Sequence, residues 1–349
     1  MSTVLILNLP YIINKNLNQV LALKNYHFLF ITKEKKIQDN QCPENCEQKP
    51  IKNPLARLFF CFFFLLKNRK KIHHVEIYPG GKLTIVFVRL SKLFRCKAIV
   101  AERGDIGCMK NYSRLMQWSM ERSYQWADIV WFREPFMEAE LKKRGVRNLF
   151  FQGNAISIPK ISKIESDKEY DFLWANRLIP ERNIRWVLDI LNSQYFVEFK
   201  TIIIGIQKET SDTQIKEEQK FLYANKPKKS IIKGFVDPCL FYRKSKFFIF
   251  PAEKTFANFS LLESMSYGVV PIISNVSGTE KIVQDGVNGI VCKFTKDGLE
   301  KGMKRALELS ESEYEQLSSN AIKTIEKNFS LNSYEKNMSK FYDALLNQV

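Results

Sequence analysis

A turn of mostly small and polar residues follows the apolar run Phe247–Pro251, and a helical pattern begins near Ser260. The amino end of a helix carries unpaired backbone N–H groups and about half a positive charge, so a turn that brings a ligand there suits a phosphate. The candidate residues of this turn and helix start are Phe256, Ala257, Asn258, Ser260 and Leu261. Any α/β domain contains such units, so the turn alone favours a purely structural role.

Three charged side chains could act together with this turn. Glu263 lies about one turn into the expected helix, where its carboxylate could accept hydrogen bonds from a ribose diol. Gly268 then ends the helix, as a glycine in the C′ position does. Arg177 and Arg182 stand in the earlier segment ANRLIPERN, and in isolation each would be a solvated charge beside a helix.

Short apolar runs alternate with longer helical patterns along the chain, which predicts parallel sheets wound on both faces. In the first half the expected strands are Val4–Asn8, His27–Thr32, Val75–Tyr78, Ala98–Ala101, Ile129–Phe132 and Asn148–Phe151. In the second half they are Tyr170–Trp174, Phe199–Gly205, Ser230–Ile232, Phe247–Pro251, Val269–Ile273 and Gly289–Cys292. We therefore expect an α/β protein of two doubly wound, Rossmann-like domains.

The length of 349 residues also favours two domains, because single hydrophobic cores stop growing near roughly 250–300 residues. The segment between Ile158 and Glu169 is polar and without strong periodicity, which predicts a boundary there. We expect a first domain over residues 1–158 and a second over residues 168–330. The remaining residues, 331–349, would form a helix that packs back on the first domain.

The composition, 45% apolar and 26% charged, is that of a globular protein rather than a disordered or integral membrane protein. The net charge of +17 admits a polyanionic partner such as nucleic acid, an anionic membrane or a phosphate-bearing substrate. No nucleic-acid-binding motif or stacking array is present, so we expect no nucleic acid partner. The apolar start Val4–Leu9 is short, lacks a basic flank and meets Pro10, which predicts a cytoplasmic location.

The seven cysteines are scattered, apart from the pair Cys42 and Cys46. The three histidines, His27, His73 and His74, stand at no recognised zinc-ligand spacing from that pair. We therefore expect reduced thiols and no metal site.

The segment Leu55–Leu66 reads LARLFFCFFFLL, with Arg57 near its start and Lys67, Arg69, Lys70 and Lys71 directly after it. It is shorter than the about 20 apolar residues that span a bilayer. Its basic flanks favour a helix lying on an anionic membrane, whereas phenylalanines on nearly every side favour a buried helix. The sequence leaves both readings open.

Four ordered motifs in the second half decide the interpretation. They are Leu261-Leu262-Glu263-Ser264-Met265, Gly268-Val269-Val270-Pro271-Ile272, Gly278-Thr279-Glu280-Lys281-Ile282-Val283 and Asp285-Gly286-Val287-Asn288-Gly289. Together they resemble the C-terminal domain of the retaining glycosyltransferases of family 4, which have the GT-B fold of two Rossmann-like domains facing a cleft. The resemblance covers about Leu115–Leu346, including Trp126-Ala127-Asp128-Ile129-Val130 and Gly153-Asn154-Ala155-Ile156.

The resemblance implies a donor site for a nucleotide diphosphate sugar, with a UDP-sugar as the expected co-substrate and no further cofactor. Arg177 and Arg182 would neutralise the diphosphate, so that no metal is needed. Gly234, Phe235 and Val236 resemble the turn that lies beside the nucleotide base. Family members carry a glutamate beside the donor sugar eight residues before the position of Glu263, where this chain has Thr255. Either Thr255 contacts a sugar hydroxyl in its place, or Glu253 reaches the site.

Two further departures fall in the first half. The family's glycine pair after the first strand is absent, and its histidine-glycine pair is replaced by Glu102-Arg103-Gly104-Asp105. Glu102 or Asp105 could take the proton of an acceptor hydroxyl while Arg103 orients the acceptor, although Glu102 and Arg103 could also form a plain surface pair. Gly80 and Gly81 could meet an acceptor phosphate, or form a simple turn.

The resemblance thus predicts transfer of a hexosyl or N-acetylhexosyl unit to a lipid-linked saccharide or another surface-glycan acceptor, with retention. The enzyme would be cytoplasmic or peripheral on the inner membrane face, in polysaccharide, lipopolysaccharide or capsule biosynthesis. Two alternatives stay open at this point. One is a GT-B nucleotide-sugar epimerase, and the other is a catalytically weak partner subunit.

Overall fold

The structure of the chain is a computed structural model that describes residues 2–12, 14–35, 42–159, 168–207, 209–254 and 258–346. Two compact units are present, one formed by Met1–Ala155 with Leu331–Val349 and the other by Ile156–Ser330. The first unit therefore consists of two stretches of chain on either side of the second. The expected boundary at Ile158 lies close to this division, and residues 160–167 of the expected linker are outside the described residues.

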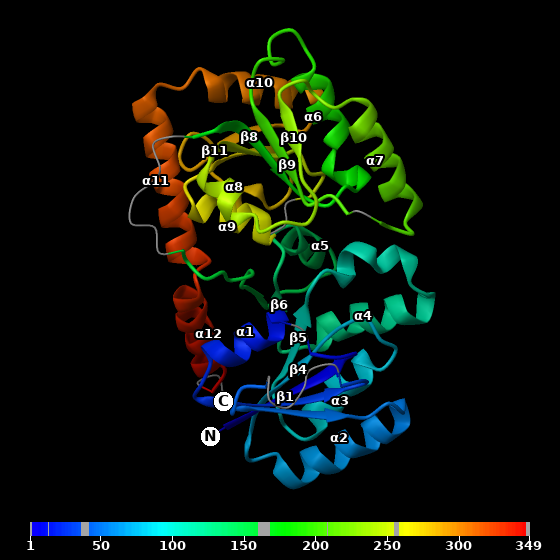
Figure 1. The fold of residues 1–349 in the computed structure, drawn as a ribbon. Coiled ribbons are helices and arrows are strands. Elements are labelled where there is room, and N and C mark those ends of the chain that lie inside the picture. Colours follow the sequence, from blue (N-terminus) through cyan, green and yellow to red (C-terminus); the bar gives the residue numbers. More distant parts are fainter. Residues whose placement is uncertain are drawn as a thin grey trace. The chain divides into compact units, whose positions relative to one another are not determined.

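The first unit contains a seven-stranded sheet in the order β3-β2-β1-β4-β5-β6-β7, with every neighbouring pair parallel. Its strands are β1 (Ser2–Leu9), β2 (Tyr26–Thr32), β3 (Cys46–Pro50), β4 (Ile72–Ile77), β5 (Ala98–Glu102), β6 (Ile129–Phe132) and β7 (Leu149–Phe151). Its helices are α1 (Asn14–Ala22), α2 (Pro54–Asn68), α3 (Thr84–Leu93), the 3₁₀ helix η2 (Asp105–Asn111), α4 (Arg114–Trp126), α5 (Met137–Lys143) and α12 (Leu331–Leu346). Figure 1 labels the main elements.

The second unit contains a six-stranded parallel sheet in the order β10-β9-β8-β11-β12-β13. Its strands are β8 (Tyr170–Ala175), β9 (Thr201–Ile204), β10 (Ser230–Ile232), β11 (Ser245–Phe250), β12 (Val270–Asn275) and β13 (Ile290–Lys293). Its helices are η3 (Pro180–Arg182), α6 (Ile184–Leu191), α7 (Thr213–Ala224), α8 (Cys239–Arg243), α9 (Phe259–Ser266), η4 (Thr279–Lys281), α10 (Lys296–Leu307) and α11 (Glu311–Asn328).

Both faces of the second sheet are covered by apolar layers, because its strands are apolar at consecutive positions. On β11, Phe248 and Phe250 belong to one core cluster, and Phe247 and Ile249 belong to the other. Successive side chains of a strand point to opposite faces, so a strand buried on both faces requires such an uninterrupted apolar run. The predicted fold class, α/β with doubly wound parallel sheets, is therefore confirmed.

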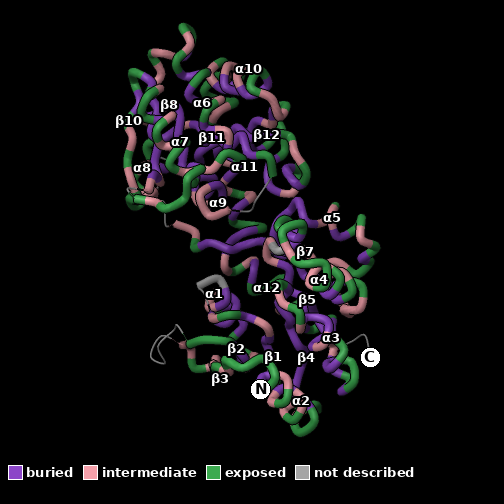
Figure 2. The backbone as a smooth tube through the Cα atoms, turned by 90° about the vertical axis from the view of Figure 1, so that its right-hand side faces the viewer, coloured by how far each residue is buried: buried purple, intermediate pink, exposed green. Residues whose placement is uncertain are grey.

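Strand β3 was not predicted. Its sequence, CEQKP, is polar, and it pairs only with β2 at the edge of the first sheet. Figure 2 shows this strand as largely exposed, in contrast to the buried central strands β1 and β4. An edge strand is solvated along one side, and β3 lacks the regular recurrence of apolar residues. Prediction of strands from sequence depends on that recurrence.

The C-terminal helix α12 completes the core of the first unit. Tyr334, Met338, Phe341 and Tyr342 pack in one apolar cluster with side chains from the sheet and from α1. Polar groups tie the helix down as well, because Gln19 Nε2 donates to the Tyr342 hydroxyl at 2.9 Å. This helix is thus part of the first unit although the second unit precedes it in the sequence.

Candidate active site

The centre of the second sheet is the point at which its strand order changes direction. From β8 the chain continues to β9 on one side, and from β11 it continues to β12 on the other side. Ligands of open parallel sheets bind at the carboxyl ends of the two strands that flank such a point. The segments that follow β8 and β11 carry Arg177, Arg182 and the turn before α9, which are the sequence-predicted donor residues.

The loop after β8 is joined to the loop after β11 by hydrogen bonds. The Asn183 side-chain amide donates to the Pro251 carbonyl at 2.8 Å, and the Glu253 amide donates to the Glu181 carbonyl at 3.1 Å. Arg182 is only 8% exposed, and its guanidinium carbon lies 4.8 Å from the ring centroid of Phe250, the last residue of β11. The structure therefore fixes Arg182 at the end of β11, in a partly apolar environment that strengthens its charge interactions.

Arg177 has a different environment, because its side chain is exposed. It follows Asn176, which is buried directly after β8. The side-chain nitrogen of Asn176, Nδ2, is buried and has no hydrogen-bond partner. A buried amide donor without a partner is costly and is well suited to a bound oxygen. Asn176 was not selected from the sequence, although its position at the carboxyl end of a parallel strand was a usable signal.

The start of α9 is held by Asn258. Its side-chain oxygen accepts from the Leu261 amide at 2.8 Å, and its side-chain nitrogen donates to Asn176 Oδ1 at 3.4 Å. The cap thus links the amino end of α9 to the end of β8. Ser260 is half-buried beside the cap, whereas the Leu261 side chain lies in the core and can offer a ligand only its backbone. Three predicted residues of this turn, Thr255, Phe256 and Ala257, lie outside the described residues.

Glu263 is half-buried on α9, one turn beyond the cap. Its Oε2 accepts a hydrogen bond from the Tyr242 hydroxyl at 3.3 Å. Burial raises the pKa of the Glu263 carboxyl, the Tyr242 hydrogen bond opposes that rise, and the negative charge of Asp237 adds to it. The carboxylate has capacity for further hydrogen bonds, since each of its oxygens can accept two.

The predicted base-side turn follows β10. The Gly234 carbonyl accepts from the Gly205 amide at 3.1 Å, which joins this turn to the end of β9. Phe235 is 70% exposed and Val236 is 40% exposed, so both present apolar surface to a planar ring. Gly205 has φ +89°, and a Cβ there would lie 3.2 Å from the Asn176 carbonyl oxygen. Glycine is therefore required where β9 passes the end of β8.

In the first unit, Glu102 is fully buried at the end of β5. Its Oε1 accepts from the amides of Gly104 and Ile106, at 2.7 and 3.2 Å, and its Oε2 accepts from the Tyr124 hydroxyl. These contacts favour a role for Glu102 in holding the loop that follows β5. Asp105 begins η2, and its side chain is not among those described.

The predicted acceptor residues lie at the same carboxyl edge of the first sheet. Gly81 packs against Asn8, so that a Cβ at Gly81 would lie 3.0 Å from the Asn8 side chain, and Gly80 has φ +102°. Arg103 donates from Nη1 to Asn16 Oδ1 at 3.1 Å and from Nη2 to the Tyr78 hydroxyl. Arg103 is thus not a plain surface residue paired with Glu102 but is anchored by two neutral groups.

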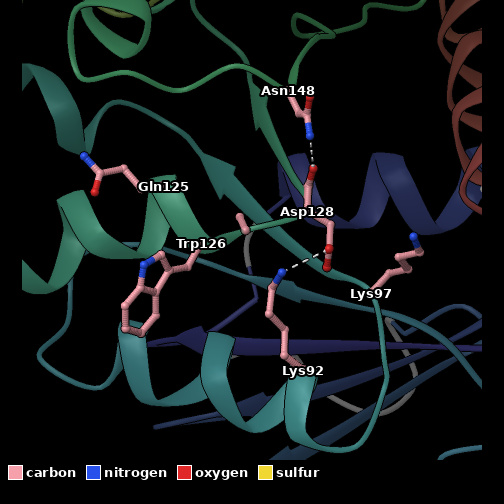
Figure 3. A pocket seen from close by; sticks show the side chains of 7 residues that line it. Lys92, Lys97, Gln125, Trp126, Asp128 and Asn148 are labelled. Atoms are coloured by element: carbon pink, nitrogen blue, oxygen red, sulfur yellow. Dashed lines mark hydrogen bonds and ion pairs between the residues drawn. The ribbon is translucent and has the colours of Figure 1, made fainter.

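One cavity of the first unit lies away from all these residues (Figure 3). It is lined by Lys92, Lys97, Gln125, Trp126, Ala127, Asp128 and Asn148, at the amino ends of β5 and β6. The carboxylate in this cavity is already engaged, because Asp128 accepts from Lys92 Nζ at 3.1 Å and from the Ala98 amide at 2.8 Å. We interpret this cavity as a packing gap between α3, α4 and the sheet and not as a ligand site. Among the described residues, no group of three or more His, Cys, Asp and Glu side chains is arranged to hold a metal ion.

The family model of glycosyl transferases group 1 matches residues 158–324, which belong to the second unit. A search of curated protein sequences returns no match to the chain.

Several solved structures are similar to the whole chain in fold. A glycosyltransferase from Rickettsia africae has 13% identity and a TM-score of 0.76, covering 100% of this chain and 99% of its own. The Anabaena protein HepE in complex with UDP has 13% identity and a TM-score of 0.76, with 99% and 100% covered. Sucrose-phosphate synthase from Thermosynechococcus elongatus has 13% identity and a TM-score of 0.73, with both chains covered completely. The predicted GT-B fold is confirmed.

Proposed function

We propose that the protein moves a hexosyl or N-acetylhexosyl unit from a UDP-sugar to a lipid-linked saccharide or another surface-glycan acceptor, with retention. The main observation behind this proposal is that Arg182, Asn176 and the capped start of α9 lie together at the carboxyl ends of β8 and β11. These two strands belong to the segment that matches the glycosyl transferases group 1 model. The complexes of Anabaena HepE with UDP and with UDP-glucose support the choice of nucleotide.

In this proposal the second unit binds the donor. Arg177 and Arg182 contact the diphosphate, and the backbone N–H groups at the start of α9 add a partial positive charge. Glu263 accepts hydrogen bonds from the ribose diol, and Phe235 packs on the base. Thr255 contacts a hydroxyl of the donor sugar. Glu253 is exposed and its backbone is held by Glu181, so its side chain is the alternative group for that contact.

The reaction breaks the bond between the anomeric carbon and the phosphate oxygen, and the electron pair leaves with UDP. The two arginines offset the charge that develops on the diphosphate, which is the role of a divalent metal in other transferases. The acceptor oxygen forms the new bond on the same face of the sugar and loses its proton. We assign the proton to Asp105, because the Glu102 carboxylate is engaged by two backbone amides and Tyr124.

The assay that tests this function combines the purified protein with a set of nucleotide sugars and measures release of the nucleoside diphosphate on addition of saccharide acceptors. We expect release from a UDP-sugar that persists in EDTA, and an unchanged anomeric configuration in the product by NMR. Binding of no nucleoside diphosphate by calorimetry would contradict the proposal. Epimerised nucleotide sugar formed without an acceptor would instead support the epimerase alternative.

Helix α2 supports a membrane-surface location for this transfer. Leu55, Phe59, Phe63 and Leu66 are 52–64% exposed, and their spacing places them on one face of the helix. The opposite face buries Arg57, Cys61 and Leu65. The helix therefore agrees in part with both interpretations left open by the sequence: one of its faces is buried in the core, and the other is an exposed apolar face. No helix among the described residues is long and apolar enough to cross a membrane.

The positive charges that follow α2 indicate what kind of membrane surface its exposed apolar face would bind. Lys67, Arg69, Lys70 and Lys71 are all exposed directly after the apolar stripe. Each cation near an anionic bilayer contributes about 1 kcal/mol to binding, and the exposed aromatic rings add apolar contact. We therefore propose that α2 lies on the anionic membrane face where lipid-linked acceptors are presented.

Liposome sedimentation separates this membrane contact from the donor site. Replacing Lys67, Arg69, Lys70 and Lys71 by Gln should lower binding to vesicles with phosphatidylglycerol, as should Phe59→Ser with Phe63→Ser. The matched control is Leu240→Ser, which changes a residue that is 62% exposed in the second unit. Equal binding of all variants to anionic vesicles would contradict the membrane contact.

A further inference from the structure

Two arginines stand side by side at the carboxyl edge of the first sheet. Strands β5 and β6 are parallel and pair Glu102 with Phe132. The residues that follow, Arg103 and Arg133, therefore lie next to each other just beyond the ends of the two strands. Arg133 received no role from the sequence and has none in the donor site. Its position is where ligands of parallel sheets bind.

Arg133 is only 4% exposed, yet two of its nitrogens, Nε and Nη2, are buried without a hydrogen-bond partner. These two nitrogens form one edge of the planar guanidinium, the edge that matches two oxygens of a carboxylate or a phosphate. The guanidinium carbon lies 4.8 Å from the ring centroid of Trp131, which orients the plane. The unpaired edge is therefore a preformed bidentate donor.

Arg103 adds a second charge and a third unpaired donor. Its Nη1 and Nη2 are bound to Asn16 and Tyr78, but its Nε is buried without a partner. Burial, and next the positive charge of Arg133, lower the pKa of Arg103 to about 10. The two guanidinium groups therefore repel each other in a poorly solvated place, and a negative charge between them would relieve that repulsion.

The buried carboxylate of Glu76 is already engaged by other partners. The nearby Glu76 interacts electrostatically with Arg103, but its oxygens already accept from Gln19 and Tyr342 and lie 3.2 Å from His74. Tyr334, on α12, interacts electrostatically with both arginines, is 4% exposed, and has a buried hydroxyl without a partner. The unpaired groups are thus three N–H donors and one hydroxyl that is able to donate.

Buried donors without acceptors cost stability unless a ligand supplies the acceptors. We propose that Arg133, Arg103 and Tyr334 form a site for an oxyanion, a phosphate or a carboxylate, carried by the acceptor substrate. This inference rests on the proposed transferase function and narrows the acceptor to anionic saccharides or lipids. Arg133 supplies the bidentate contact, Arg103 supplies the second charge, and the Tyr334 hydroxyl donates to a further oxygen.

The test uses the full chain saturated with UDP, so that the donor site cannot bind the probes. Calorimetry compares glucose 1-phosphate, glucuronate and uncharged glucose. We expect at least one of the two anions to bind tenfold or more tightly than glucose, and the stronger of the two identifies phosphate or carboxylate. Equal affinity for all three probes would overturn the proposal.

Variants assign the binding to this site. Arg133→Gln should remove the preference for the anion, and Tyr334→Phe, which keeps the ring, should reduce it severalfold. Arg114→Gln, at an exposed arginine of the same unit, should leave it unchanged. Inorganic phosphate should raise Tm in the wild type and in Arg114→Gln, but not in Arg133→Gln.

The failures of the two proposals are distinguishable. UDP should bind all these variants as it binds the wild type. If UDP binds but Arg133→Gln retains the anion preference, the site is wrong and the transferase function stands. If UDP does not bind the wild type, the proposed donor site is wrong. The oxyanion site is then still tested, because Arg133→Gln should lose anion binding that the wild type shows.

Discussion

The Tyr342 hydroxyl on α12 donates a hydrogen bond to the Glu76 carboxylate on β4, with 2.5 Å between the oxygens. Both side chains are completely buried. Gln19 on α1 donates to the same carboxylate at 3.0 Å, so two helices and the sheet share one buried charge. A buried carboxylate needs such partners, because removing one leaves it with the full cost of its lost solvation.

Tyr342→Phe should therefore lower the free energy of unfolding of the first unit by about 1.5–3 kcal/mol, the usual range for a hydrogen bond to a charged group. Denaturant unfolding followed by tryptophan fluorescence measures this. Tyr26→Phe is the matched control, because it removes an exposed hydrogen bond at 3.2 Å to Asp343 on the same helix. Equal effects of the two substitutions would show that the buried network contributes little.

The first unit should lose stability in mild acid because of His73. Burial, and next the charge of His74, lower the pKa of His73 from 6.5 to about 4. Between these values the unfolded chain binds a proton that the folded chain does not, so stability is complete above pH 6.5 and falls as pH decreases towards 4. The slope should reach about 1.4 kcal/mol per pH unit. His73→Gln should reduce the change in the free energy of unfolding between pH 6.5 and pH 4, and an unchanged pH dependence would contradict the assignment to His73.

Donor binding should depend on Glu263 and Arg182. Replacing either by Ala should weaken UDP binding by more than about tenfold, equivalent to about 1.4 kcal/mol, because each would lose a polar contact with the ligand. Isothermal calorimetry measures the affinity, and Glu217→Ala, at an exposed position on α7, is the control. Unchanged affinity in both variants would remove these residues from the donor site.

Gly205 offers a test of the geometry behind the site. Gly205→Ala and Gly145→Ala both place a side chain at positive φ, +89° and +76°, and each should cost about 1–2 kcal/mol. Only at Gly205 does the new Cβ press on the Asn176 carbonyl, at 3.2 Å, whereas nothing lies within 4 Å at Gly145. Gly205→Ala alone should therefore also reduce UDP affinity. Equal UDP affinity in the two variants would mean that Asn176 is not part of the site.

The fold was predictable because the buried strands are apolar over their whole length. Tyr170–Ala175 and Ser245–Phe250, for example, carry almost continuous apolar runs that are typical of a parallel sheet covered on both faces. The edge strand β3 was not, since its stability depends on hydrogen bonds to β2 rather than on apolar side chains. The strand β4 contains His73, His74 and Glu76, whose burial depends on α1 and α12, elements distant in the sequence.

The residues of the proposed donor site were predictable for a different reason. Arg182 and Glu263 stand in segments that resemble a known family, and Asn258 stands in the turn before an expected helix. The structure places Arg182 at the end of β11 and joins Asn258 to the end of the neighbouring strand β8. Asn176 stands in the segment ANRLIPERN but was not selected there, and Arg133 is outside any motif that was used. Their importance depends on atoms left without partners, Asn176 Nδ2 and the Arg133 guanidinium edge, and only a three-dimensional arrangement identifies such atoms.

The order in which the chain is synthesised gives α12 a further consequence. Strands β1 to β7 leave the ribosome first, but the helix that covers Glu76 is translated only after the whole of residues 156–330. At roughly 5–20 residues per second, this delay is on the order of ten seconds or more. During that time the apolar patch that receives Met338 and Tyr342 has no cover, so we expect the nascent first unit to expose this patch until α12 docks.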